Sequence, residues 1–122
     1  MTNPPEPVPK PGDIVLMDFA PVRGSEQGGT RPALVISEPG MHEMTKRAVI
    51  CPITRNIRPW PSKVFLPAGL AVEGAVLVDQ VRSVDRQARI LRALGKVPKP
   101  VLNEVRRKLA ALVGIEVHGL NE

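Results

Sequence analysis

Cysteine and aromatic residues are scarce in this 122-residue chain, and their scarcity excludes several kinds of protein. A single cysteine, Cys51, rules out an intramolecular disulfide, and with only two histidines the chain offers no zinc site of recognisable spacing. The only aromatic side chains are Phe19, Trp60 and Phe65, and tyrosine is absent. This composition argues against a platform of several stacked rings of the kind found in single-strand-binding modules.

Long hydrophobic runs are also absent. No segment approaches the roughly 18 apolar residues that a membrane-spanning helix needs, and residues 1–11 contain no apolar run of signal-peptide length. Cys51 follows the apolar residues 48–50 in a predicted buried strand, which suits a reducing compartment. We therefore predict a soluble, cytoplasmic protein without a membrane partner.

The chain has the composition of one globular domain, with 43 % hydrophobic and 24 % charged residues. Its formal net charge is +5, and the sequence pI is near 10.0. The positive charge is uneven: nine cationic residues lie between Arg82 and Lys108, against two acidic ones, Asp85 and Glu104. This stretch is either a solvated charged face or a phosphate-binding face, and composition alone does not choose between them.

The pattern of apolar residues predicts a mainly β domain. Residues 1–11 hold five of the fourteen prolines and are expected to form a flexible, dispensable tail. Residues 12–115 would form the folded domain and residues 116–122 a C-terminal tail. Short apolar runs predict strands at 14–19, 33–37, 48–53, 63–66, 75–78 continuing into 81–84, and 90–94. Strands of this length and spacing favour a small barrel or sandwich.

The end of the domain has a helical period instead. Apolar residues from Val101 to Val113 recur on one face of a helix, Pro100 suits its first turn, and Gly114 suits its end. We therefore predict several short strands followed by one packed helix.

Three segments carry residues that could do chemistry. In the first, the glycine-rich stretch 24–32, Pro32 holds Arg31 in an extended conformation just before a strand; the alternative is a plain hairpin loop with solvated charges. In the second, Pro52 predicts a strand edge or bulge, and Thr54 lies where that strand ends. In the third, Asp79-Gln80 interrupts an apolar run, which predicts either a buried hydrogen-bonded network or a ligand contact.

These segments, taken in order, closely resemble those of the MazF/PemK toxins of bacterial toxin–antitoxin pairs. The match extends from Gly12 to about Ile115. The motifs are Gly12-Asp13, Glu26-Gln27-Gly28-x-x-Arg31-Pro32, Cys51-Pro52-x-Thr54 and Asp79-Gln80-Val81-Arg82-Ser83-x-Asp85. Each motif is short, but their order and spacing together are specific.

The resemblance implies a small SH3-like β-barrel with a C-terminal helix, of the CcdB/Kid/MazF type, that forms a homodimer. It also implies a sequence-specific endoribonuclease that cleaves single-stranded RNA without a metal or other cofactor, through attack of the 2′-OH on the scissile phosphate. Such a toxin inhibits translation and growth, and a cognate MazE-like antitoxin blocks its site.

The resemblance further assigns residues. The MazF branch attributes catalysis to the positions occupied here by Arg31 and Thr54. The PemK/Kid branch attributes it to positions that are Ser25, Asp79 and Leu77 in this chain, so only the Asp of that set is present. We therefore expect this chain to use Arg31 and Thr54 for catalysis, as in the MazF branch.

Other residues complete the predicted site. Neither arginine nor threonine is an obvious general base at neutral pH, so Glu26 is kept as a candidate base or as a partner of Arg31. The candidates for catalytic or RNA-binding roles are Glu26, Gln27, Asp79 and Gln80, and those for RNA binding are Arg55, Arg82 and Arg86. The alternative functions are a CcdB-like toxin that poisons DNA gyrase without nuclease activity, and a barrel that binds RNA or a partner without catalysis.

Overall fold

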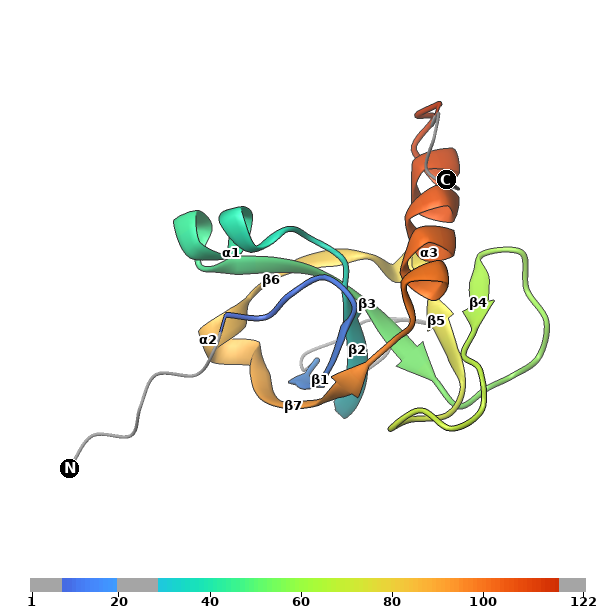
Figure 1. Ribbon diagram of the computed structural model, residues 1–122, viewed down its shortest axis with the longest axis horizontal. Coiled ribbons are helices and arrows are strands. Elements are labelled where there is room, and N and C mark those ends of the chain that lie inside the picture. The colour runs from blue at the N-terminus through green and yellow to red at the C-terminus, as the bar shows by residue number, and fades with distance from the viewer. Residues whose placement is uncertain (1–7, 20–28, 117–122) are drawn as a thin grey trace.

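The computed structural model describes residues 8–19 and 29–116 (Figure 1). Its elements, in chain order, are β1 (Asp13–Asp18), β2 (Thr30–Val35), α1 (Pro39–Thr45), β3 (Arg47–Thr54), β4 (Lys63–Phe65), β5 (Ala75–Leu77), the 3-10 turn η1 (Val78–Gln80), β6 (Arg82–Asp85), α2 (Arg86–Arg89), β7 (Ile90–Lys96) and α3 (Lys99–Leu112). The mainly β architecture with a C-terminal helix is therefore confirmed.

The strands form one antiparallel sheet of seven strands, centred on β3. Its main path runs β4-β5-β3-β2-β1-β7, and β6 pairs with β3 beside this path. Along one edge of β3, the pairing with β6 covers Arg47–Ile50 and the pairing with β5 covers Ile53 and Thr54. One long strand therefore holds two short ones end to end.

The sheet does not close into a barrel, which corrects the expectation of a closed SH3-like barrel. Among the described residues, no ladder joins β7 to β6 or to β4. The chain leaves β6 through the single turn of α2, whose start is capped by the Asp85 carboxylate accepting from the backbone N–H of Gln87 and Ala88 at 3.0 and 3.1 Å. This turn separates β6 from β7 where a closed barrel would pair them.

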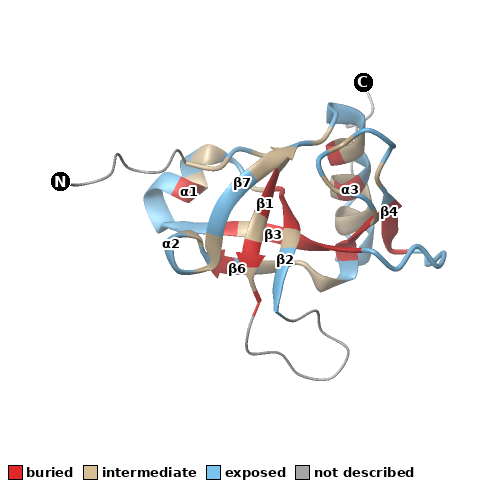
Figure 2. Cartoon of the chain, turned by 90° about the horizontal axis from the view of Figure 1, so that it is seen from below, coloured by how far each residue is buried: buried red, intermediate tan, exposed pale blue. Residues whose placement is uncertain are grey.

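Both faces of the sheet bury apolar side chains because residues alternate between the faces along each strand. Ile14, Leu34, Cys51 and Ile53 lie on one face, which α3 covers with Leu102 and Val105. The opposite face contains a second cluster: Val15, Met17, Phe19, Ala33, Val35, Ala48, Ile50 and Val84. Figure 2 shows the buried residues following β1 and β3 through the middle of the molecule.

Two sequence interpretations change in the structure. Arg31 lies inside β2, opposite Met17, and not before the strand. Pro52 lies neither at a sheet edge nor in a bulge but inside β3, opposite Ala33. Along the other edge of β3, the pairing with β6 ends at Ile50 and the pairing with β5 begins at Ile53. Pro52 therefore lies in the gap (the lapse in β3 pairing) between these two partner strands, where its lack of an N–H breaks no ladder hydrogen bond.

The N-terminal tail also differs from the expectation, because its described part from Val8 onward is held against the domain. The buried ring of His42 donates from Nδ1 to the Pro9 carbonyl at 2.6 Å, and its Nε2 bonds the Ser37 hydroxyl. Ser37 Oγ also accepts from the Val49 N–H at 2.8 Å. Sequence analysis did not predict α1, the element that positions this histidine.

Candidate active site

The β2–β3 ladder brings the two predicted catalytic residues to one end of one sheet face. Its pairs are Val35–Ile50, Leu34–Cys51 and Ala33–Pro52. Arg31 lies near the start of β2, and Thr54 is the last residue of β3. Because the strands are antiparallel, both residues lie at the same end of this ladder, two residues beyond its last pair. Because side chains alternate along a strand, both lie on the face that Ala33 occupies. Arg31 is exposed there.

The position of Thr54 is fixed by tight local packing. Its hydroxyl oxygen accepts from the Asn56 N–H at 3.1 Å, and the residue is 6 % exposed. Its backbone pairs with Ala75 in β5. Gly74, the residue before Ala75, has φ +131°, and a Cβ built on it would stand 2.0 Å from the Thr54 carbonyl oxygen. Only glycine permits this approach, so the turn before β5 holds the end of β3.

Arg82 joins the same face from β6. It pairs with Ile50, a member of the core cluster on that face. Its guanidinium carbon lies 5.8 Å from the centroid of the Phe19 ring, within the range of a cation–π contact. Phe19 follows Met17 by two residues and is buried in the same cluster. Sequence reasoning did not identify this contact, although the two-residue period of β1 would have placed Phe19 on the correct face.

Asp79 and Gln80 lie in η1, the turn that joins β5 to β6, and these two strands pair with β3 on either side of Cys51 and Pro52. Asp79 is exposed and Gln80 is half-buried, so of the two alternatives left open by the sequence, the buried network does not fit and the ligand contact remains a prediction. The pKa of the Cys51 thiol is raised to about 12, mainly by burial and secondly by the negative charge of Asp79.

The remaining predicted residues are only partly brought together. Arg55 follows Thr54 directly and is exposed. Arg86 lies after β6 at the far end of β3, about 25 Å from Thr54 at ~3.4 Å per strand residue, and its Nε donates to the His42 carbonyl at 3.2 Å. Glu26 and Gln27 lie outside the described residues. On either side of that segment, Phe19 N–H donates to the Gly29 carbonyl at 2.9 Å.

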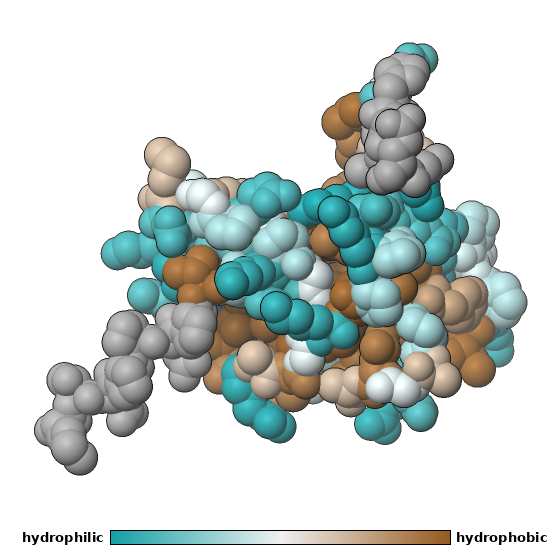
Figure 3. Space-filling model, viewed as in Figure 1, coloured by the Kyte–Doolittle hydropathy of each residue, from teal (hydrophilic) through white to brown (hydrophobic). Residues whose placement is uncertain are grey.

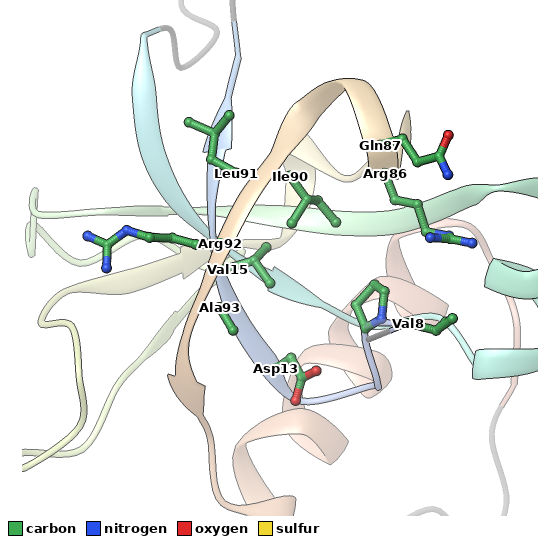
Figure 4. A pocket seen from close by; sticks show the side chains of 10 residues that line it. Val8, Asp13, Val15, Arg86, Gln87, Ile90, Leu91, Arg92 and Ala93 are labelled. Atoms are coloured by element: carbon green, nitrogen blue, oxygen red, sulfur yellow. The ribbon is translucent and has the colours of Figure 1, made fainter. Parts of the chain in front are cut away.

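A separate cavity of about 470 Å³ lies between the N-terminal segment and β7 (Figure 4). Val15, Ile90 and Ala93 form its apolar part, while the side chains of Arg86 and Arg92 point to opposite sides. This cavity lies apart from Arg31 and Thr54, neither of which lines it.

Two further observations concern residues 8–19 and 29–116. Within these ranges, no three His, Cys, Asp or Glu side chains gather as ligands for a metal ion. Within the same ranges, no helix is long and apolar enough to cross a membrane.

The fold and this face together define a small antiparallel β protein whose exposed guanidinium groups and neighbouring hydroxyl suit an anionic, phosphate-like ligand. Residues 10–113 match the family described as PemK-like, MazF-like toxin of type II toxin–antitoxin system, and the chain belongs to this family.

Similar proteins agree with this assignment. The chain is 36 % identical over 107 residues to the endoribonuclease toxin MazF of Escherichia coli, covering 88 % of this chain and 96 % of that protein. It is 33 % identical to the endoribonuclease PemK of Escherichia coli over 84 % of this chain and 80 % of that protein. Among solved structures, MazF from Deinococcus radiodurans superposes with a TM-score of 0.85 at 43 % identity, covering 90 % of this chain and all of that one.

Proposed function

We propose that this chain is the endoribonuclease toxin of a toxin–antitoxin pair. The observation that carries this proposal is the family match over residues 10–113, together with relatives of nearly equal length that are named endoribonucleases. The CcdB-like alternative, a gyrase poison without nuclease activity, is not supported by these relatives. Because messenger RNA is the substrate, the site of action is the cytoplasm.

The RNA supplies its own nucleophile. The 2′-oxygen forms a bond to the adjacent phosphorus, its proton is removed, and the bond from phosphorus to the 5′-oxygen breaks as that oxygen takes up a proton. Arg31 donates two hydrogen bonds to phosphate oxygens whose negative charge grows in the transition state. The Thr54 hydroxyl, held beside the Asn56 N–H, orients the phosphate or the 2′-OH. Glu26 is our candidate for the proton acceptor.

The basic residues near this face support the rest of the binding site. Arg82 and Arg55 would neutralise neighbouring phosphates of the RNA. Asp79 and Gln80 would contact the RNA strand where it passes the gap between β5 and β6 along β3. Arg86, which the sequence also suggests for RNA binding, donates to the His42 carbonyl, and this bond favours a structural role.

The partners of the proposed toxin are an antitoxin and a second copy of this chain. Structures of MazE–MazF from Deinococcus radiodurans, one with a TM-score of 0.79 at 38 % identity, support an antitoxin partner. A domain this small gains apolar burial by pairing, so we infer a two-fold homodimer whose RNA groove crosses the interface. An acidic antitoxin segment would compete for the same basic groove in a chain of net charge +5.

One assay tests the function. Purified protein is incubated with a labelled single-stranded transcript in EDTA, and the product ends are sequenced. Cleavage at a short recurring sequence supports the proposal, while intact RNA with stalled DNA gyrase supports the CcdB-like alternative. Light scattering and a titration of RNA-bound protein with antitoxin test the partners. An active monomer, or an antitoxin that binds without displacing RNA, contradicts that part.

A further inference from the structure

The loop that follows Thr54, residues 55–62, presents the chain's single tryptophan at the surface. Trp60 is 63 % exposed between two prolines, Pro59 and Pro61, that restrict its backbone. A second ring, Phe65 at the end of β4, is 47 % exposed. Both rings line one cavity of about 530 Å³. Two exposed rings around one cavity form a local surface that the core does not require.

Hydrogen bonds from two other elements hold this loop in place. Lys63 Nζ donates to the carbonyls of Asn56 and Arg58, each at 2.8 Å, and Lys63 N–H donates to the Trp60 carbonyl at 3.0 Å. From α3, Lys108 Nζ donates to the Pro61 carbonyl at 2.7 Å. A ring mounted on a backbone fixed in this way loses little conformational entropy when a ligand binds.

Phe65 links this cavity to the candidate active site, and Trp60 shares the cavity with it beside Glu104 and Lys108 of α3. Thr54 pairs with Ala75, and Ala75 pairs with Phe65 on its other side, so these three residues form one row across β3, β5 and β4. Residues directly opposite in antiparallel strands point to the same face, so Phe65 lies on the Thr54 face. Two strand spacings of ~4.8 Å separate their backbones by about 10 Å.

Cations surround the rings. Arg55 and Arg58 are exposed in the loop, Lys63 and Lys108 line the cavity, and Glu104 is the one acidic residue among the described residues that line it. On the β4 side of the molecule, hydrophobic and hydrophilic residues lie side by side at the surface (Figure 3). Flat rings among positive charges are the combination with which proteins bind single-stranded nucleic acid.

We propose that Trp60 and Phe65 form a stacking subsite for one base of the RNA, adjacent to the phosphate bound at Arg31 and Thr54. The inference rests on the proposed function and extends it to two rings that position the RNA strand beside the reacting phosphate. An acidic peptide could pair with the cations, but the two rings favour a nucleobase, because every base presents a π face to stack against.

Trp60 fluorescence tests this directly, because the chain has one tryptophan and no tyrosine. The probe is an RNA oligonucleotide spanning a cut site mapped on a transcript, with a 2′-O-methyl group in place of the attacking hydroxyl. We expect saturable quenching of Trp60 emission. In cleavage assays, Trp60→Ala should raise KM roughly 10- to 100-fold with kcat nearly unchanged, as expected for the loss of one stacked base. Trp60→Phe should recover most of that loss.

The matched control is Ile57→Ala, which removes an equally exposed apolar side chain from the same loop and should leave KM unchanged. An unchanged KM for folded Trp60→Ala, with wild-type cleavage intact, overturns the stacking subsite and leaves the proposed function standing. Quenching by an acidic peptide but not by RNA also overturns it, in favour of a protein-docking surface. If the wild-type protein cuts no RNA, the proposed function fails and the subsite fails with it.

Discussion

Arg31 and Thr54 stand on neighbouring antiparallel strands, each two residues beyond the Ala33–Pro52 pair that ends their ladder. Arg31 is held on its other side by its pair with Met17, and Thr54 by its pair with Ala75. Strand pairing therefore brings two motifs that are distant in sequence together at one end of one sheet face. The chemistry we propose depends on this register, because a slip of one residue would move either side chain to the opposite face.

Replacing Arg31 tests the main cation at the scissile phosphate. Arg31→Ala should lower kcat/KM by roughly 10²–10⁴-fold, the scale for losing one essential transition-state donor. Arg31→Lys should restore only part of the activity, because an ammonium group lacks the planar fork that binds two phosphate oxygens. The control is Arg92→Ala, an exposed arginine on β7, which should retain most activity. Near wild-type cleavage by a folded Arg31→Ala protein contradicts the assignment.

Thr54 tests whether the hydroxyl group itself is required. Thr54→Ser keeps an oxygen that can accept from the Asn56 N–H, and we expect activity within several-fold of wild type. Thr54→Val keeps the shape but removes the hydroxyl, so cleavage should fall roughly 10- to 10³-fold. It also leaves the Asn56 N–H without its acceptor, which should cost about 1–2 kcal/mol in urea unfolding. Equal rates for the two variants would show that the hydroxyl is not part of the chemistry.

Gly74 tests the support beneath Thr54. An alanine Cβ at this position would meet the Thr54 carbonyl oxygen at 2.0 Å, and the backbone has φ +131°. Gly74→Ala should therefore destabilise the fold by roughly 2–4 kcal/mol and lower cleavage by displacing the end of β3. Gly40→Ala is the control, since that position is open, and it should be neutral or slightly stabilising. A Gly74→Ala protein as stable as wild type would contradict the close packing.

The periodic elements could be predicted from the sequence because their apolar residues report burial directly. The terminal helix was predicted from Pro100, the apolar face and Gly114, and the structure confirms it as α3, followed by Gly114 at φ +79°. The predicted continuous strand through Val81 was wrong, because Asp79 and Gln80 form a 3-10 turn that lets the chain cross from β5 to β6.

The short helices had no such signal. Only seven residues form α1, and a single turn forms α2, so neither is long enough to show a helical period. The sequence likewise could not show that the cations between Arg82 and Lys108 would disperse. Arg82 covers Phe19, whereas Arg106 donates to the Ile36 carbonyl at 2.7 Å and pairs with Glu38 at 3.1 Å. Such separations depend on strand register and helix packing, which local patterns do not encode.

The N-terminal segment provides a test of stability. Deleting residues 1–10 removes the Pro9 carbonyl that accepts from the buried His42 Nδ1, so a donor is left without a partner. The free energy of unfolding in urea should fall by roughly 1–3 kcal/mol. The control deletion of residues 1–7 removes none of the described hydrogen bonds and should leave stability unchanged. If both deletions unfold at the same urea concentration, the whole tail is dispensable, as the sequence predicted.

Cys51 should make the free energy of unfolding depend on pH in the alkaline range. Its thiol has an ordinary pKa of 9.0, which burial and Asp79 raise to about 12 in the folded protein. Between these values the unfolded chain has lost its thiol proton while the folded protein keeps it, so stability falls as pH rises, by about 1.4 kcal/mol per pH unit from this group. Cys51→Ala removes this contribution. Urea unfolding between pH 9 and pH 11 should therefore show a shallower decline for the variant than for wild type, whatever their difference at neutral pH. Parallel declines would mean that the folded environment does not hold the proton on this thiol.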